Sequence, residues 1–418
     1  MRPTDVLVVG SGMAGLIAAI TAASRGKSVR LAARGAGHLA VGNGCVDVLG
    51  YVDGEIVRGN PVDSISRLSG DHPYRRIGAE TVAESLAFFA RLCAENGFDL
   101  AGGNGENQWI PTALGSFKPT WFYTPAMNRE TLSMADRIVI THMPWLKDCH
   151  ADMVKACLAR QRRLMSKDMY IEETAPFRAH RNLTPLAAAR FVDTEAGERW
   201  LLSQLSQCLQ RSSSGRRTAV LLPPILGVTR SAEIRARLSE ALDADLIEMA
   251  SPPPGVGGLR IRRTLLRAAA GVGVTVMENA HVVEARVQGQ RCVSLVCDAT
   301  GGEREVKADS FIIATGGFLN GGLVAAPGGK VCEAIFGHAL PAPERTEDWT
   351  MPDMLDSQPY AKLGVQTNTR LNPITPEGDA LPDNVYFAGR TLAGYDFVNE
   401  KSGMGVAIAT GYHAGMNC

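Results

Sequence analysis

The sequence lacks a surplus of charge of either sign. Its 43 basic and 43 acidic side chains give a formal net charge of zero over 418 residues. Because binding along a nucleic acid requires a basic surplus to meet the phosphates, this balance argues against a nucleic-acid-binding protein. The apolar fraction of 45% is typical of a globular chain, and the length is sufficient for one large core plus an inserted second domain.

The cysteines lack the spacing of a metal site. There are nine of them, an odd number, irregularly distributed and without a C-x-x-C pair. Zinc and iron–sulfur sites need clustered thiolates, and a secreted disulfide framework normally uses an even number. We therefore expect a protein of the reducing cytoplasm without a metal, so that any iron–sulfur centre lies on a partner.

Long hydrophobic runs are also missing. No segment reaches the roughly 18 apolar residues that a membrane span needs, so attachment to a membrane would require a partner. The apolar stretch from Val6 to Ala23 could pass for a signal peptide, but it contains Gly10, Gly12 and Gly15 at a meaningful spacing. A dinucleotide fingerprint explains those three glycines better.

That fingerprint is G-x-G-x-x-G between a predicted strand over residues 5–10 and a predicted helix over 12–24, followed by a second strand over 28–33. Gly10 and Gly12 would let a phosphate approach the backbone, and Gly15 would let the helix pack on the strand. The first helical turn, with Met13 and Ala14, would offer free N–H groups to the phosphate. A tight turn without a ligand is the alternative.

The second strand departs from the usual dinucleotide pattern. An acidic residue normally follows the fingerprint by about 20 positions and accepts hydrogen bonds from the adenosine ribose. Here no Asp or Glu occurs from residue 6 to residue 46, and the strand ends in Ala33 and Arg34. FMN has no adenosine half and would not need the acid. NADP, whose 2′-phosphate accepts arginine, or a vestigial site would also account for its absence.

A second glycine-rich block follows an apolar strand over residues 310–317. It consists of Ala314, Thr315, Gly316 and Gly317, which are small enough for a cofactor to pass close to the strand end. A structural turn is the alternative, but the position of this block after the N-terminal fingerprint favours a cofactor contact.

The third block lies between residues 389 and 406. Gly389 and Arg390 follow a short strand over 384–389, and Asp396 could accept a ribityl or substrate hydroxyl. A helix starting near Gly403, which includes Gly405 and Val406, would direct its positive end at a reduced flavin. A surface turn with a solvated Asp396 is the alternative.

The order of the predicted elements indicates an α/β protein with a Rossmann-like two-dinucleotide-binding-domain flavoprotein fold and an inserted α/β domain. We predict a first flavin-binding part over residues 1–104, an inserted substrate or partner domain over 105–254, and a second flavin-binding part over 255–418. Residues 101–125 show little periodicity and are predicted as a long connection. The run Pro252–Gly255 marks the end of the insertion.

Further elements are predicted from hydrophobic periodicity. The predicted helices cover residues 79–96, 151–163, 199–211 and 259–270, and the predicted strands cover 137–141, 169–173, 218–222, 274–278, 282–287 and 292–297.

These blocks, in this order, resemble flavoproteins of the fumarate-reductase and glycerol-3-phosphate-dehydrogenase kind, and more closely the B-type subunit family of anaerobic glycerol-3-phosphate dehydrogenase. The resemblance covers nearly the whole chain. Beyond the glycine blocks it rests on Arg34-Gly35, Gly44–Leu49, His72-Pro73-Tyr74, Leu114-Gly115, Thr120-Trp121, Gly321–Val324 and Gly394–Asp396. The segment Asn399–Ser402 departs from the family pattern, because it is more polar.

The resemblance implies FMN on this chain, with FAD as the alternative, and Gly42 and Gly44 among the cofactor contacts. It also implies an FAD-carrying catalytic sister subunit and an iron–sulfur subunit that anchors the complex at the membrane and passes electrons to quinone. The chain itself would then be cytoplasmic, peripheral to the inner face of the cell membrane, and would take part in glycerol metabolism by oxidising glycerol 3-phosphate to dihydroxyacetone phosphate or by relaying its electrons.

Oxidising a secondary alcohol needs a base for the hydroxyl proton and a hydride acceptor. His72 and His38 are the candidate bases, although an isolated histidine is more often structural. A phosphorylated substrate favours arginine ligands, for which the candidates are Arg260, Arg262, Arg263 and Arg390. A stand-alone flavin oxidoreductase of another small organic acid or alcohol, and a cofactor-free scaffold subunit of a redox complex, remain the alternative functions.

Overall fold

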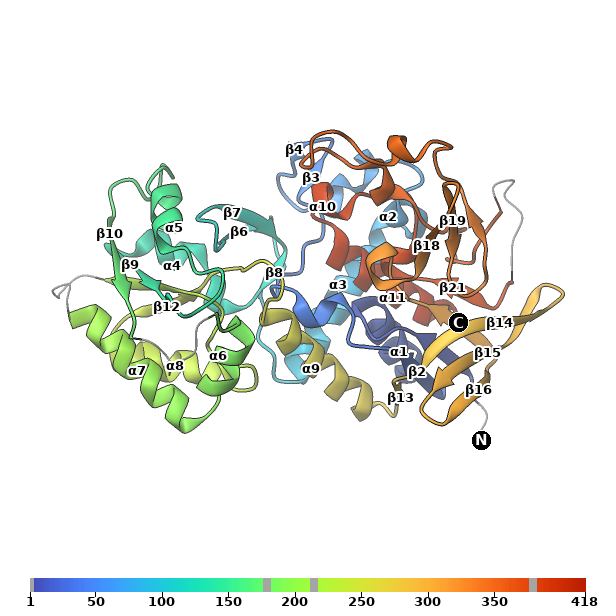
Figure 1. Cartoon of the computed structure of the whole chain (residues 1–418), viewed down its shortest axis with the longest axis horizontal. Coiled ribbons are helices and arrows are strands. Elements are labelled where there is room, and N and C mark those ends of the chain that lie inside the picture. Colours follow the sequence, from blue (N-terminus) through green and yellow to red (C-terminus); the bar gives the residue numbers. More distant parts are fainter. Residues whose placement is uncertain (1–3, 176–181, 211–216, 376–381) are drawn as a thin grey trace.

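The computed structural model describes residues 4–175, 182–210, 217–375 and 382–418. These residues form two lobes that lie side by side (Figure 1). One lobe contains the beginning and the end of the described chain, and the other, drawn in green, is built from its middle third.

The first lobe is built on a five-stranded parallel sheet with the order β13-β2-β1-β17-β21. Its strands are β1 (Val6–Val9), β2 (Val29–Ala33), β13 (Thr275–Glu278), β17 (Ser310–Ile313) and β21 (Val385–Phe387). The three central strands are almost wholly buried, as expected for a parallel sheet that is covered on both faces. The predicted strand–helix–strand unit is therefore present, with the helix α1 over Met13–Ser24.

Helix α1 packs against the last helix, α11 (Gly403–Asn417), along a stripe of small residues. A Cβ on Gly411 would lie 2.4 Å from the carbonyl oxygen of Ala14, and one on Gly415 would lie 2.6 Å from that of Ala18. Since residues four apart on one helix meet residues four apart on the other in the same order, the two helices run in the same direction. Along their common direction, the N-terminus of α11 therefore extends about two turns beyond the N-terminus of α1.

The remaining helices of the first lobe are α2 (Pro73–Ile77), α3 (Ala79–Glu95), α9 (Gly257–Gly271) and α10 (Phe397–Glu400). Two antiparallel sheets complete this lobe. They are formed by β14 (His281–Gln288), β15 (Arg291–Ala299) and β16 (Gly302–Lys307), and by β18 (Leu323–Ala326), β19 (Lys330–Glu333) and β20 (Ala339–Leu340).

The second lobe has its own four-stranded parallel sheet, in the order β10-β9-β11-β12. Its strands are β9 (Arg137–His142), β10 (Asp168–Glu173), β11 (Thr218–Leu222) and β12 (Asp245–Glu248), and its helices are α4 (Arg129–Met134), α5 (Ala151–Leu158), α6 (Pro185–Val192), α7 (Glu195–Gln210) and α8 (Ser231–Leu242). Alternate residues of β9 and β11 enter two separate apolar clusters, one on each face of the sheet. This sheet lies within the segment predicted as the insertion.

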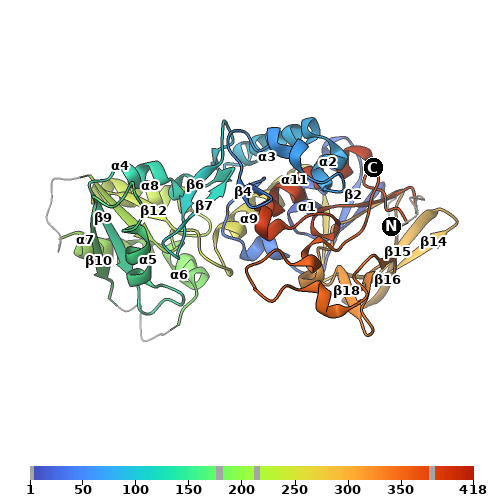
Figure 2. The ribbon, with the colours of Figure 1, turned by 90° about the horizontal axis from the view of Figure 1, so that it is seen from above.

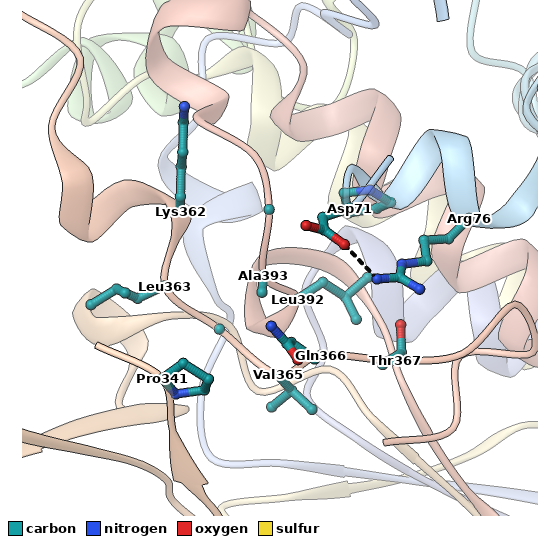
Figure 3. A pocket seen from close by; sticks show the side chains of 13 residues that line it. Asp71, Arg76, Pro341, Lys362, Leu363, Val365, Gln366, Thr367, Leu392 and Ala393 are labelled. Carbon is teal, nitrogen blue, oxygen red and sulfur yellow. Dashed lines mark hydrogen bonds and ion pairs between the residues drawn. The ribbon is translucent and has the colours of Figure 1, made fainter. Parts of the chain in front are cut away.

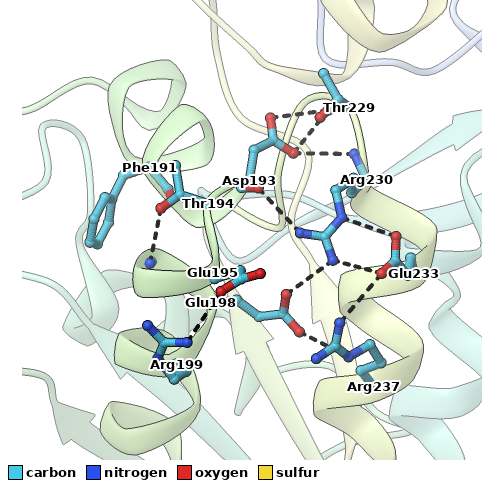
Figure 4. A network of polar contacts seen from close by, with 11 residues as sticks. Phe191, Asp193, Thr194, Glu195, Glu198, Arg199, Thr229, Arg230, Glu233 and Arg237 are labelled. Atoms are coloured by element: carbon cyan, nitrogen blue, oxygen red, sulfur yellow. Dashed lines mark hydrogen bonds and ion pairs between the residues drawn. The ribbon is translucent and has the colours of Figure 1, made fainter.

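A polar network joins helices α6, α7 and α8 of this lobe (Figure 4). Asp193 accepts hydrogen bonds from the backbone N–H groups of Val228, Thr229 and Arg230. The Arg230 guanidinium then bridges Glu198 on α7 and Glu233 on α8. The carboxylate thus fixes the turn before α8, and the arginine holds two helices together.

The two lobes are connected through α9 and through short strands between residues 101 and 123. Figure 2 shows α9, β6 and β7 between the two larger bodies. The segment 101–125 is not the plain connection predicted from its lack of periodicity. It contains β5 (Ala101–Gly102), β6 (Gln108–Pro111), β7 (Phe117–Thr120) and β8 (Phe122–Tyr123), of which β6 pairs with β7 and β5 with β8. A further short hairpin joins β3 (Tyr51–Val52) to β4 (Glu55–Ile56).

All nine cysteines are free thiols. Within the described ranges, every helix is too short or too polar to span a membrane.

Candidate cofactor site

The carboxyl ends of four parallel strands bring the predicted glycine blocks together. Val9 at the end of β1 is in register with Ala32 of β2 and with Ile313 of β17, and Ile313 is in register with Phe387 of β21. The residues that follow these strands therefore meet at one edge of the sheet. They are Gly10, Ala33 with Arg34, Ala314 to Gly316, and Gly389. Ligands of open α/β sheets bind at this edge.

Gly10 and Gly15 allow close backbone packing at this edge. Gly10 has a φ of +107°, and a Cβ there would lie 2.3 Å from the carbonyl oxygen of Ala314. A Cβ on Gly15 would lie 1.8 Å from the carbonyl oxygen of Gly10, so this glycine lets α1 approach the end of β1. Both positions are therefore required by the packing of the protein itself.

Gly12 differs from the other two glycines because a Cβ there would meet no atom of the described residues within 4 Å. It is the N-cap of α1, which has neither a side-chain cap nor an acidic residue in its first turn. The first turn, with Met13 and Ala14, thus presents its N–H groups and positive end to open space. This arrangement fits a bound phosphate, which would satisfy those donors.

The block after β17 also carries an unused polar group. The Thr315 hydroxyl is buried and finds no hydrogen-bond partner in the part of the chain that the structure describes. Next to it, the N–H of Gly316 donates to the hydroxyl of Thr391, which donates in turn to the carbonyl oxygen of Gly316. Gly389 approaches α1, since a Cβ there would lie 2.8 Å from the Ala14 side chain. These contacts fix the block after β17, and the Thr315 hydroxyl is left available to form a hydrogen bond with a cofactor.

The end of β2 carries no acid, as the sequence shows, and Arg34 is exposed there. However, β13 lies beside β2, with Glu278 in register with Ala33. Glu278 is the last residue of its strand and is exposed. A carboxylate therefore stands next to the position where the usual ribose acid is missing. Sequence reasoning overlooked it because the pairing of β13 with β2 joins residues about 245 positions apart.

Helix α11 brings its N-terminus to the same edge of the sheet. It begins at Gly403 without a side-chain cap or an acidic residue in its first turn. The N–H of Gly405 donates to the carbonyl oxygen of Asp47, and a Cβ on Gly405 would lie 2.2 Å from the hydroxyl of Tyr74. Val406 is fully buried. The predicted helix start is confirmed, and Gly405 serves the packing of the loop around Asp47.

The loop that contains Gly42 and Gly44 packs against the start of α9 through glycine–glycine contacts. A Cβ on Gly44 would lie 2.7 Å from the Cα of Gly257, and one on Gly258 would lie 2.9 Å from both the nitrogen and the oxygen of Gly42. These contacts fix the course of the chain toward Asp47.

A cluster of charged groups beyond this loop was not predicted. Lys118 of β7 lies 2.6 Å from the carboxylate of Asp47, and both side chains are mostly buried. Burial works against the charge of Lys118, but the attraction of Asp47 outweighs it and raises the pKa of Lys118. Lys401, between α10 and α11, is also near this pair, and its burial lowers its pKa. The ion pair between Lys118 and Asp47 thus joins the hairpin β6–β7 to the loop beside the N-terminus of α11.

His72 does not have the free nitrogen that a catalytic base requires. It is almost completely buried, and its Nδ1 accepts a hydrogen bond from the N–H of Tyr74 at 3.0 Å, which caps α2. Its Nε2 therefore carries the proton and donates to Glu400 at 3.1 Å. Burial acts to raise the pKa of Glu400, but hydrogen bonds from His72, the N–H of Asp396 and Ser402 hold it below its ordinary value. The predicted role of His72 as a base is thus replaced by a positioning role beside α10.

Asp396 is also engaged within the protein. One carboxylate oxygen accepts from the N–H groups of Val398 and Asn399 and so caps α10, and the other accepts from Ser357 and from the Asn399 amide. Burial acts to raise its pKa, but these hydrogen bonds keep it below the ordinary value. Asp396 shapes the turn before α11 and has no free oxygen for the predicted ribityl or substrate hydroxyl.

Arg390 is held by the chain around it. Its guanidinium donates to the carbonyl oxygens of Ala361 and Leu363 and lies over the rings of Tyr395 and Phe397. It also lies against Gly317, close to the second glycine block. Its position beside the predicted site is therefore retained, but its hydrogen bonds are used within the protein.

Three arginines of α9 were candidates for a substrate phosphate, and the structure separates them. Arg260 is buried and forms a two-pronged ion pair with Glu248, at 2.6 and 3.0 Å, so its charge is already paired. Arg263 is exposed. Arg262 is half-buried, and its Nε is a buried donor with no partner among the described residues. Of the three, Arg262 is the one with a buried donor still available.

His38, the other candidate base, is exposed in the turn η1 (His38–Val41). It follows Gly37, where a Cβ would lie 3.3 Å from the Cα of Gly12. His38 therefore stands near the phosphate end of the site, and its catalytic role remains a prediction.

A separate cavity of about 200 Å³ lies between α2 and the segments 362–367 and 392–394. Asp71 and Arg76 form an ion pair at its wall, and Lys362, Gln366 and Thr367 also line it (Figure 3). None of the side chains predicted for the cofactor faces this cavity.

Taken together, the glycines, the uncapped helix N-termini and the unpartnered Thr315 fit a nucleotide cofactor at the edge of the sheet. Comparison with known proteins agrees with this geometry. The family of FAD binding domains matches residues 5–406. A relative from Halobacterium salinarum (strain ATCC 29341 / DSM 671 / R1), named as the probable B-type subunit of anaerobic glycerol-3-phosphate dehydrogenase, is 32% identical over 99% of this chain and 97% of the relative.

The B-type subunit of anaerobic glycerol-3-phosphate dehydrogenase from Vibrio cholerae (strain El Tor Inaba N16961) is 29% identical, over 99% of this chain and 96% of the relative. Among solved structures, the open conformation of a flavocytochrome c3 fumarate reductase is 11% identical, with a TM-score of 0.45, over 100% of this chain and 78% of that chain. On the family match and the full-length relatives, the chain belongs to the FAD-binding-domain flavoproteins and, among them, to the B-type subunit family of anaerobic glycerol-3-phosphate dehydrogenase.

Proposed function

We propose that this chain is the flavin-carrying subunit of an anaerobic, quinone-linked sn-glycerol-3-phosphate dehydrogenase. It either oxidises glycerol 3-phosphate to dihydroxyacetone phosphate or relays the electrons of that oxidation to an iron–sulfur subunit. The observation that carries the proposal is the match along 99% of the chain to relatives named as the B-type subunit of this dehydrogenase. The glycine-lined edge at Gly12 supports it independently, because a phosphate can approach the backbone there without meeting a side chain.

For the cofactor we propose FAD, with FMN as the alternative. The missing acid on β2 favoured FMN, since FMN lacks the adenosine ribose. Two observations favour FAD instead. The family that matches is that of FAD binding domains, and Glu278 stands beside Ala33, where it can accept the ribose hydroxyls. In this arrangement the first turn of α1 holds the phosphates, and Thr315 donates to the cofactor near the end of β17.

The bound flavin would supply the hydride acceptor for the alcohol. The residues of this chain would position the substrate beside it. We propose that Lys118 and Lys401, which both lie near Asp47 at the junction of the lobes, bind the phosphate of glycerol 3-phosphate. Lys118 donates to both carboxylate oxygens of Asp47, and Lys401 donates to the carbonyl oxygen of Val398. Because an ammonium group has three N–H donors, each lysine keeps at least one for the phosphate. The partly buried setting of this cluster would exclude water from the substrate.

We further propose that the chain works in a complex with an FAD-containing catalytic sister subunit and an iron–sulfur subunit. The iron–sulfur subunit would hold the complex at the inner face of the cell membrane, with this chain on the cytoplasmic side. The support is that the relatives are named as one lettered subunit of a dehydrogenase.

The decisive experiment is to co-express the full chain with the other dehydrogenase subunits of the same organism and to purify them through a tag on this chain. The flavin is then released and identified by chromatography, and glycerol-3-phosphate oxidation is measured with a quinone analogue. We expect flavin on this chain and activity in the complex.

Other outcomes would select the alternatives. A flavin-bearing chain that purifies alone and oxidises another small organic acid or alcohol would indicate a stand-alone oxidoreductase. A colourless chain that stays in the complex, even after reconstitution with FAD and FMN, would indicate a scaffold subunit. Release of FMN instead of FAD would contradict the role given to Glu278.

A further inference from the structure

The loop over residues 350–357 exposes an unusual amount of apolar surface. All eight of its residues are exposed, and Met354 and Leu355 are 85% and 80% accessible to solvent. Met351 in the same loop is also exposed. Next to the loop, Tyr360 packs edge-on against Phe318, whose neighbour Leu319 is 84% accessible. We call Met351, Met354, Leu355 and Tyr360, which lie within ten residues of the chain, the apolar patch. Large apolar side chains left exposed close together on a folded protein typically mark an interaction site.

The loop is held in one conformation despite its exposure. Gln358 accepts a hydrogen bond from the N–H of Met351 and donates to the carbonyl oxygens of Asp353 and Asp356. The N–H of Leu355 donates to the carboxylate of Asp353 at 2.8 Å. Several of its backbone polar groups are thus paired locally, while Met354 and Leu355 extend into solvent. An apolar pair displayed on an ordered loop loses little conformational entropy when a partner covers it.

The apolar patch is flanked by negative charge. Between residues 344 and 358 the sequence has five acidic residues and a single basic one. That one basic residue, Arg345, forms an ion pair with Glu347 at 2.7 Å. Glu344, Asp348, Asp353 and Asp356 are exposed, and no ion pair engages them in the described part of the chain. A surface of this kind is complementary to a partner that has basic residues around an apolar contact area.

The loop is also coupled to the cofactor edge. Ser357 donates a hydrogen bond to Asp396 at 2.8 Å, and Asp396 caps α10 immediately before α11. A protein bound to the loop would therefore lie close to the N-terminus of α11. This is a suitable place for a protein that exchanges electrons with the cofactor.

We propose that the apolar patch and its acidic flank form the docking surface for another subunit of the dehydrogenase, one that presents basic side chains around an apolar centre. The inference rests on the proposed function, which requires a partner subunit. The partner is a different protein, because a second copy of this chain would bring a second acidic loop against the first.

The test uses the full chain co-expressed with the other subunits of the dehydrogenase, recovered through a tag on one of those subunits. The double variant Met354→Asp/Leu355→Asp should reduce the amount of this chain recovered by more than about tenfold. The variant Asp348→Lys/Asp356→Lys should also reduce recovery, and recovery of the unchanged chain should fall with rising salt. Met165→Asp, on a similarly exposed methionine of the second lobe, is the matched control and should be recovered normally.

Each variant is also checked alone for flavin content and melting temperature, so that a folding defect is recognised. A second readout is hydrogen exchange of residues 344–360, which the complex should slow. Equal recovery of the Met354→Asp/Leu355→Asp variant and the unchanged chain would overturn the docking surface while leaving the proposed complex intact. Failure of the unchanged chain to bind any of the other subunits would overturn both. Loss of self-association in the variant, with partner binding unchanged, would assign the surface to a second copy instead.

Discussion

Gly12 and Gly15 belong to one fingerprint, yet a methyl group would meet different surroundings at each. At Gly12 it would enter open space in front of α1, whereas at Gly15 it would meet the carbonyl oxygen of Gly10 at 1.8 Å. We predict that Gly12→Ala changes the stability of the cofactor-free protein by less than about 1 kcal/mol but lowers its flavin occupancy markedly. Gly15→Ala should cost about 1–3 kcal/mol or more. Flavin-to-protein ratio and urea unfolding measure the two effects, and normal flavin content in Gly12→Ala would contradict the site.

Glu333 is a carboxyl group in an apolar setting. Its side chain is almost completely buried, one oxygen accepts from the N–H groups of Ile335 and Phe336, and the other finds no partner within the described ranges. Burial raises the pKa of Glu333 from 4.5 to about 7. The folded protein therefore holds this proton more tightly than the unfolded chain does.

The sign of the pH dependence follows from this shift. The stabilising contribution of the protonated Glu333 is complete below about pH 4.5 and is lost as the pH rises through about 7. We predict that Glu333→Gln is more stable than the unchanged protein at pH 8, by up to about 3 kcal/mol, and equally stable near pH 4.5. Melting temperatures at both pH values test this, with the exposed Glu303→Gln as the control. An equal effect at both pH values would show that the charge of Glu333 is not responsible.

For single residues, the sequence predicted which ones lie near the site better than it predicted what their side chains do. The glycines of the fingerprint were found because their spacing alone indicates where the backbone requires a glycine. The partners of His72 and Arg260 could not be found in the same way. Glu400 lies 328 positions from His72, and Glu248 belongs to a strand that hydrophobic periodicity did not reveal. A residue type indicates what a side chain can do, but only the fold decides which group takes its hydrogen bonds.

Among the elements, α9 and β12 are joined by the ion pair between Arg260 and Glu248, whose side chains are 3% and 0% exposed. We predict that Arg260→Met destabilises the protein by about 3–5 kcal/mol, because it leaves the carboxylate buried without its partner. Adding Glu248→Gln should recover part of this loss, since the amide oxygen can still accept from the N–H of Leu226. Urea unfolding of the single and double variants measures the difference.

A matched control for this ion pair is Arg199→Met. Arg199 pairs with Glu195 at the surface, so the change should cost less than about 1 kcal/mol. If Arg260→Met were as mild as Arg199→Met, the buried pair would not be the connection that holds α9 to the second lobe.

The elements themselves were largely predictable. The helices α1, α3, α9 and α11 and all five strands of the first sheet lie where their periodicity and flanking glycines indicated. The short strands β5 to β8 were missed because two to four residues carry no measurable period. Helices α6 and α8 were also missed. The hydrophobic pattern of α8 is weak, since Ile234 and Leu238 are its only buried residues.

For the whole molecule, the junction of the two lobes is where we place the substrate. Lys118 comes from the hairpin β6–β7 and Asp47 from the loop beside α11, so their ion pair spans the junction. We predict that Lys118→Met in the assembled dehydrogenase raises KM for glycerol 3-phosphate by at least about tenfold, with a smaller change in kcat. Steady-state kinetics test this, with the exposed Lys307→Met as the control. An unchanged KM would remove Lys118 from the substrate site.

The parallel packing of α1 against α11 also has a consequence for biosynthesis. Almost every residue of α1 is buried, and one flank of it is covered by α11, which lies nearly 380 residues later in the chain. At about 5–20 residues per second, a ribosome needs roughly 20–80 s to make that stretch. For this time the nascent α1 lacks its covering helix and its apolar flank is open to aggregation or to a chaperone. The cofactor edge is complete only when α11 has docked, so flavin insertion must follow translation of α11.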